Sequence, residues 1–199
     1  GRGGYPDAVE RLRVQDLDAL RSRYWRLATP DDFDPVDRLV DVNPLNIVHL
    51  PLIRRLFPGA PVVTMLRDPR DVVLSGFFRD PTPDEAMIHF HSPESLADLY
   101  ADVMGLWLSV RDRVGLRMYA VRYEDLVDDL DRQSRRLLGV LGLPYNPAAL
   151  CSPASDEAVG AGVTGAVVRA GAVGRHRHYA RQLRGVDAVL APFVELLGY

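Results

Sequence analysis

The sequence contains no lysine, and all 24 of its basic side chains are arginines. Base composition in a GC-rich genome explains this absence, but the consequence is chemical, because no mechanism that requires a lysine fits this chain. The single cysteine, Cys151, excludes a disulfide within the chain and is typical of the reducing cytoplasm. No run of about 18 apolar residues is present, so the sequence predicts no membrane span.

The remaining composition is that of an ordinary globular domain. Of the 199 residues, 47% are hydrophobic and 26% are charged, and the formal net charge is -3. The length predicts a single domain over residues 1–199 with a sizeable core. The mildly acidic balance argues against a general affinity for nucleic acids or anionic membranes.

Hydrophobic periodicity predicts an alternation of helices and strands. Helices are expected over residues 6–28, 45–57, 69–78, 95–114, 124–141 and 186–197, with a short one from residue 176. Strands are expected over residues 38–42, 61–66 and 116–123, and loops over 80–93 and 151–174. The β-branched run 61–66 is typical of a fully buried strand. Because strands alternate with helices, the pattern favours parallel βαβ units in one α/β fold.

The sharpest local feature is LRDPRDVVLS, residues 66–75. Arg67 leaves the carboxyl end of a predicted strand, where α/β sheets bind ligands, and the Asp68-Pro pair predicts a helix whose N–H groups face the same place. A guanidinium there can bind a phosphate bidentately, and Ser75 could reach the same anion. The alternative is structural: Asp68 and Asp71 have the spacing of a capping box, and Arg67 is a surface arginine.

Two further stretches contain residues suited to a nucleotide. Tyr123 lies at the matching strand-to-helix junction and could stack on a base, or it could close the edge of the core. Residues 169–184 contain five arginines with His176 and His178, and no acid. In an acidic protein this stretch indicates a local anion site, or else the solvated face of a basic helix.

Several segments, in order along the chain, resemble one enzyme family. LFPGAPVVTMLRDPRDVVLSGFF, RYEDLVDDLDRQSRRLLGVLGLP and VGRHRHY are similar to segments of the sulfotransferases that use 3′-phosphoadenosine 5′-phosphosulfate (PAPS). VDVNPLNIVHLPLIRRLFPGA resembles the DKxPxN segment of a bacterial branch often fused to tetratricopeptide repeats and related to tyrosylprotein sulfotransferases, and YPDAVERL resembles the stretch before it. The resemblance covers most of residues 5–185.

The resemblance implies a P-loop NTPase-like three-layer α/β fold with a central parallel sheet, and PAPS as a co-substrate lying across the strand ends. In the family, the Arg and Ser of the RDPRDVVLS pattern bind the 3′-phosphate, and the tyrosine of the YED element lies by the adenine. A late glycine-arginine element closes over the 3′-phosphate. The residues that the resemblance assigns to the nucleotide are Arg67, Ser75, Tyr123, Gly174 and Arg175, with Arg177 as a further candidate.

The chain also departs from the family pattern. The first strand, its PxSGTT-type phosphosulfate loop and the Gly-Glu element thought to carry the base would precede residue 1, which implies an N-terminally truncated chain. The family's sulfuryl-stabilising lysine in DKxPxN is Val42 here, and the usual Trp after the late Gly-Arg is His176. We therefore expect the nucleotide-binding half of the site and leave the catalytic residue unassigned.

The histidines are weaker candidates. His49 lies in an HLPL sequence that also occurs in cytosolic small-molecule sulfotransferases, where the histidine is the base. Its spacing to Arg67 is short for that role, and it falls within a predicted helix, which favours a structural histidine. His89 and His91 could suggest a metal site, but no third ligand has useful spacing, so no metal is expected.

Two functions stay open at this point. The first is a cytoplasmic enzyme that transfers a sulfuryl group from PAPS to an acceptor hydroxyl or similar group, without a nucleic-acid partner. The second is a non-catalytic relic that binds 3′-phosphoadenosine nucleotides or acts as an interaction module. A P-loop kinase is disfavoured because the sequence has neither a GxxxxGK[ST] motif nor a lysine.

Overall fold

A computed structural model describes residues 4–30, 32–34, 38–78, 91–147 and 170–199. The chain divides into two compact units. The first unit comprises residues Gly1–Val62 and Leu106–Arg117, and the second comprises Val63–Gly105 and Met118–Tyr199. The predicted loops over 80–93 and 151–174 lie largely outside the described residues.

Two helices replace the single helix expected over residues 6–28. Helix α1 spans Tyr5–Glu10 and α2 spans Val14–Ala28. The break has a local cause, because the Arg13 N–H donates to the carboxylate of Asp16 at 2.9 Å and so caps a new helix start. The end of α2 just ahead of Pro30 agrees with the sequence prediction.

The helix expected over residues 45–57 is also divided. A 3₁₀ helix, η1, spans Pro44–His49, and the α-helix α3 spans Leu50–Leu56. Pro51 lies in the first turn of α3, where its missing N–H costs no helical hydrogen bond. Within the first unit, α3 packs against α1 and α2.

The strand expected over residues 38–42 is wrong, because this segment is irregular. Its alternating apolar side chains are not buried: Val40 is 76% exposed and Val42 is 65% exposed. The polar side chain between them is bonded instead, since the Asp41 carboxylate accepts from the Tyr24 hydroxyl at 2.9 Å. Alternation without a partner strand and without burial does not make a strand.

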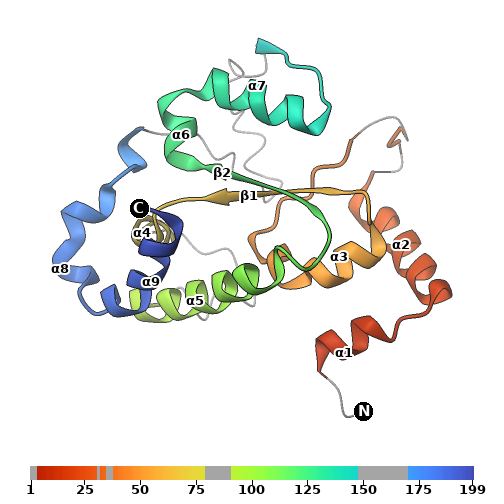
Figure 1. The fold of residues 1–199 in the computed structure, drawn as a ribbon, viewed down its shortest axis with the longest axis horizontal. Helices are drawn as coiled ribbons and strands as arrows, with labels where there is room; N and C mark the ends of the chain where they lie inside the picture. The colour runs from red at the N-terminus through yellow and green to blue at the C-terminus, as the bar shows by residue number, and fades with distance from the viewer. Residues whose placement is uncertain (1–3, 31, 35–37, 79–90, 148–169) are drawn as a thin grey trace. The chain divides into compact units, whose positions relative to one another are not determined.

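Across the described residues, two strands form one small parallel sheet (Figure 1). They are β1 (Pro61–Leu66) and β2 (Arg117–Arg122), both at the predicted positions. The full burial expected of β1 is wrong. Thr64 is buried, whereas Val63 is 38% and Met65 is 51% exposed, because no described layer covers that face of the strand. The described elements are thus helices with a parallel pair, and the three-layer arrangement stays a prediction.

Helix α4 spans Pro69–Phe77 and follows β1 as predicted. Asp68 is its N-cap, and its carboxylate accepts from the Arg70 N–H at 2.9 Å. In the second unit α4 packs against the C-terminal helix α9 (Asp187–Leu197) and against the 3₁₀ helix η6 (Arg175–Tyr179). The core of this unit consists of the buried apolar side chains Val73, Leu96, Ala97, Leu183, Val186 and Leu190.

The other elements follow the predicted order with one further division. Helix α5 spans Pro93–Val110, and the helix expected over 124–141 is split into α6 (Tyr123–Asp128) and α7 (Leu130–Leu141). The split occurs because Asp129 has a non-helical backbone conformation and caps α7, accepting from the Arg132 N–H at 3.0 Å. The remaining short elements are the 3₁₀ helix η5 (Ala170–Ala172) and the α-helix α8 (Ala180–Leu183).

Candidate anion-binding site

Arg67 follows the last residue of β1 and lies at the centre of the candidate site. Its Nη1 donates to the Ser75 hydroxyl at 2.9 Å, and its Nη2 donates to the Ala172 carbonyl at 2.6 Å. Ser75 lies two turns into α4, as its spacing indicated. The structure therefore places the two predicted phosphate ligands, Arg67 and Ser75, in direct contact.

The Arg67 guanidinium also lies over an aromatic ring. Its central carbon is 4.9 Å from the centroid of the Tyr123 ring, a cation–π distance. Tyr123 is the first residue of α6, directly after β2, so the carboxyl ends of both parallel strands deliver a side chain to the same place. This is the edge of a parallel sheet at which ligands are usually bound.

One donor of Arg67 has no acceptor among the described residues. The Nε atom is buried and makes no hydrogen bond within the described part of the chain. A guanidinium has five N–H donors, and a buried unmade bond of a charged group is costly. An oxyanion is the acceptor that suits this position, because Nε and a neighbouring Nη together fit two phosphate oxygens.

Gly174 and the two arginines after it form the turn next to Arg67. Gly174 has φ 67°, a left-handed conformation that favours glycine, and its carbonyl accepts from the Arg177 N–H at 3.1 Å. The Arg177 side chain lies beside this glycine and is exposed. The Arg175 guanidinium lies instead over the rings of Phe78 and Tyr179, at 4.9 and 5.8 Å.

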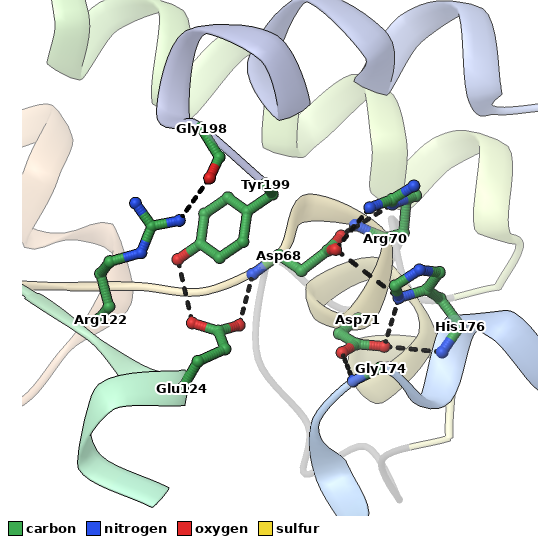
Figure 2. Close-up of polar contacts among 9 residues, drawn as sticks. All are labelled: Asp68, Arg70, Asp71, Arg122, Glu124, Gly174, His176, Gly198 and Tyr199. Atoms are coloured by element: carbon green, nitrogen blue, oxygen red, sulfur yellow. Dashed lines mark hydrogen bonds and ion pairs between the residues drawn. The ribbon is translucent and has the colours of Figure 1, made fainter. Parts of the chain in front are cut away.

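Asp71 holds this turn against α4 (Figure 2). Its carboxylate accepts from the Gly174 N–H at 2.7 Å and from the His176 N–H at 2.7 Å, and it also contacts the His176 Nδ1 at 3.0 Å. Because a carboxylate only accepts, this ring nitrogen carries the proton. The capping-box interpretation is thus half right: Asp68 caps α4, while Asp71 binds residues more than a hundred positions away.

Asp68 lies in the same polar group. It makes an ion pair with Arg70 at 2.6 Å and lies 3.7 Å from His176 Nδ1. Burial opposes its charged form, but hydrogen bonds from Arg70 and the charges of His176 and Arg70 lower its pKa below the usual value. The predicted role of the α4 N-terminus is modified accordingly, because the Arg70 N–H is already bonded to Asp68.

Glu124 connects the start of α4 to the end of the chain (Figure 2). Its carboxylate accepts from the Asp68 N–H at 3.0 Å and from the Tyr199 hydroxyl at 3.1 Å. Arg122 lies 4.0 Å from the Tyr199 ring centroid and donates to the Gly198 carbonyl at 2.8 Å. Burial and the neighbouring Glu124 raise the pKa of Tyr199, against the opposing charge of Arg122. Sequence reasoning did not identify this bond from Glu124 to the β1–α4 turn.

The histidines outside this site have other surroundings. His49 ends η1 in the first unit, and its Nδ1 lies 2.7 Å from the Tyr5 hydroxyl. His91 is exposed, and His89 lies outside the described residues. Among the residues with defined positions, no group of three or more His, Cys, Asp or Glu side chains could hold a metal ion. No helix in the described part of the chain has the length and apolar character needed to cross a membrane.

Comparison with known proteins gives a consistent result. A model of the sulfotransferase family matches residues 5–147. Over 136 residues the chain is 32% identical to the human protein Sulfotransferase 2B1, an alignment that covers 62% of this chain and 34% of the relative. The chain thus spans about a third of the length of the curated relative it matches.

Proposed function

Since the chain belongs to the sulfotransferase family, we propose that its second unit binds the 3′-phosphoadenosine part of PAPS and that the whole protein transfers the sulfuryl group to an acceptor hydroxyl or similar group. The observation that carries this proposal is the Arg67 guanidinium. It is held by Ser75 and Ala172 and retains a buried Nε–H without an acceptor in the described residues.

Arg67 and Ser75 are the proposed ligands of the 3′-phosphate. Arg67 offers charged N–H donors, and the Ser75 hydroxyl both accepts from Arg67 and has its own proton to donate to an anion. Charge-assisted bonds of this kind are stronger than neutral ones. Because the chain has no lysine, arginines supply the positive side chains that face the phosphates.

Tyr123 is the proposed contact for the adenine. Its ring lies beside Arg67 at the end of β2, so a base stacked on it would place the ribose phosphate near the guanidinium. Gly174 supports the proposal by bringing its turn next to Arg67, through the Ala172 carbonyl. The Arg177 side chain lies beside Gly174, whereas the Arg175 guanidinium lies over the ring of Phe78.

In the proposed reaction the acceptor oxygen attacks the sulfur, the bond from sulfur to the bridging oxygen of the 5′-phosphate breaks, and adenosine 3′,5′-bisphosphate leaves. The acceptor proton passes to a base. In this proposal the described residues of the chain bind the 3′-phosphate and the adenine, and so orient the nucleotide for the transfer.

A non-catalytic nucleotide-binding module is the second candidate. It is favoured by Val42, which takes the place of the family lysine and whose side chain is 65% exposed in an irregular segment. The two candidates differ in turnover: the full-length protein as encoded in its genome either consumes PAPS with an acceptor or binds adenosine 3′,5′-bisphosphate without turnover. Nucleotide binding by this chain is common to both.

Calorimetric titration with adenosine 3′,5′-bisphosphate tests the binding proposal. Arg67→Ala removes one charged hydrogen-bonding partner, and we expect it to weaken binding by about 1.5–3 kcal/mol, or roughly 10- to 150-fold in Kd. Arg136→Ala, which removes the same charge from an exposed position on α7, is the matched control and should bind like the wild type. Equal affinity in the Arg67 variant and the wild type would contradict the assignment.

A further inference from the structure

Asp71 is an ionisable side chain with no exposed surface, and the proposed nucleotide contacts do not use it. A buried carboxylate is costly unless fixed donors surround it. Asp71 has such donors: Oδ2 accepts from the Gly174 N–H, and Oδ1 accepts from the N–H and ring of His176. All of them come from one short turn more than a hundred residues away along the chain. The Asp71 carboxylate therefore binds that turn.

The face of α4 that carries Asp71 also binds the Arg67 side chain, through Ser75. Asp71 and Ser75 are four residues apart, so they lie one above the other on the helix. Asp71 binds the turn at Gly174, and Ser75 binds the guanidinium of Arg67. The ring of contacts closes through Ala172, two residues before Gly174, whose carbonyl accepts from Arg67. Displacing the turn from Asp71 therefore removes one of the two groups that orient Arg67.

We propose that Asp71 is a positioning residue that sets the selectivity of this site for a nucleotide with a 3′-phosphate, by holding the turn at residues 172–176 that orients Arg67. The proposal rests on the proposed function and adds a residue that does not itself touch the nucleotide. Asp71 acts through two backbone N–H groups and one ring N–H, and the effect reaches the anion through the Ala172 carbonyl.

His176 adds a side-chain contact to this arrangement. The ring donates to Asp71 at 3.0 Å and lies 3.7 Å from Asp68, whose charge is paired with Arg70. These are the charged groups that face the Asp71–His176 contact from α4 and η6. The backbone of the turn already donates two hydrogen bonds to the Asp71 carboxylate, and the His176 ring adds a third. Asp71 therefore binds the turn at both Gly174 and His176.

Asp71→Asn tests the proposal with little change in shape. An amide has one acceptor oxygen, so in either orientation its NH₂ faces a backbone N–H, and either Gly174 or His176 loses its acceptor. We expect the NMR exchange of these two amide hydrogens to become faster. We also expect the ratio of the Kd for 5′-AMP to the Kd for adenosine 3′,5′-bisphosphate to fall about tenfold, which is about 1.4 kcal/mol of selectivity. The control is Asp98→Asn, at an exposed position of α5 in the same unit.

The outcomes separate this inference from the proposed function. Faster amide exchange with a reduced ratio supports it. If amide exchange at Gly174 and His176 is unchanged, Asp71 does not hold the turn and the proposal is overturned. If exchange becomes faster but the ratio of the two Kd values is unchanged, Asp71 is a purely structural residue and the proposal is also overturned. A wild type that binds neither nucleotide overturns the proposed function and, with it, the link to selectivity.

If Asp71→Asn does not fold, a second variant tests the same contact. Gly174→Ala perturbs the same contact from the turn, because alanine resists a φ of 67°. The added Cβ has room, since the nearest atom would lie at 3.6 Å, so the cost is conformational. We expect the same fall in the nucleotide ratio, and a ratio equal to that of the wild type would overturn the proposal.

Discussion

The two compact units use the same basic side chain, arginine, in different ways. In the first unit, Arg55 donates to three backbone carbonyls at and just after the end of α1, those of Val9, Glu10 and Leu12. In the second unit, Arg67 donates to a hydroxyl and one carbonyl and lies over a tyrosine ring. The first arginine completes a helix end, and the second retains a buried donor for which the described residues supply no acceptor.

The acidic side chains show the same difference. In the first unit, Asp18 pairs with Arg21 at 2.6 Å while its side chain is 64% exposed. In the second unit, Asp71 is fully buried and Asp68 nearly so, and both contact His176. Buried charges are concentrated at functional sites, because they are stabilised only in a prepared environment. The comparison teaches that the second unit contains the candidate site.

Among the variants that compare the two units, Arg55→Ala is expected to change the free energy of unfolding most. Removal of the guanidinium leaves the carbonyls at the end of α1 without these donors, and we expect the free energy of unfolding to fall by about 1–3 kcal/mol. Both tryptophans of the chain, Trp25 and Trp107, lie in the first unit, so urea unfolding followed by tryptophan fluorescence reports on it. Arg11→Ala, at an exposed position, is the control.

The same Arg55 variant sharpens the comparison with Arg67. Its Kd for adenosine 3′,5′-bisphosphate should equal that of the wild type under conditions where the variant is folded. A loss of affinity as large as that expected for Arg67→Ala would show that the arginines of the first unit also serve the site, and the contrast between the two units would be wrong.

A smaller effect is expected from acid. The pKa of Asp68 is lowered in the folded chain, so its carboxylate contributes stability above the unfolded pKa of about 3.9, and this contribution is lost as the pH falls through the lower folded value. We expect Asp68→Asn to reduce the fall in stability from about pH 5 downward. Urea unfolding followed by far-ultraviolet circular dichroism at several pH values measures this slope.

The matched control for the acid experiment is Asp112→Asn in the first unit, whose side chain is 82% exposed. This variant should keep the pH dependence of the wild type. If Asp68→Asn shows the same pH dependence as the wild type, the polar group around His176 does not contribute to acid sensitivity.

The smallest effect is expected from the exposed ion pair of the first unit. Asp18→Asn removes the partner of Arg21 at a site where water screens the charge, so the free energy of unfolding should change by less than about 1 kcal/mol. Fluorescence-detected unfolding is again the measurement. If Asp18→Asn lowered the free energy of unfolding more than Arg55→Ala does, the exposed Asp18–Arg21 pair would matter more than the bonds from Arg55 to the backbone, which would contradict this prediction.

Much of the fold was predictable from local sequence. The Asp68-Pro69 cap, the strand over 61–66 and the helix end at residue 141 all appear where the residues indicated, because each depends on neighbours within a few positions. The strand expected over 38–42 failed because a strand requires a partner and a covered face. The helix breaks at Arg13 and Asp129 depend on single side-chain caps, which periodicity does not detect.

The candidate site was predictable in part. Arg67 and Ser75 share one helix start, so their spacing brings them together, and Tyr123 follows from the pairing of two parallel strands. Asp71 was missed as a partner of Gly174, and so was the position of the Arg175 guanidinium over the ring of Phe78. The nucleotide roles of these residues and the bacterial branch stay predictions.

The sequence by itself determined the membership of a sulfotransferase family, the absence of any lysine and the meeting of Arg67 with Ser75 of α4. These depend on residue identity and on spacings of a few positions. Only the tertiary structure decided that Asp71 binds the turn at Gly174 and that the Ala172 carbonyl orients Arg67. Those contacts join segments about a hundred residues apart, and they form because a buried carboxylate and a partly buried guanidinium require partners that only the folded chain brings within reach.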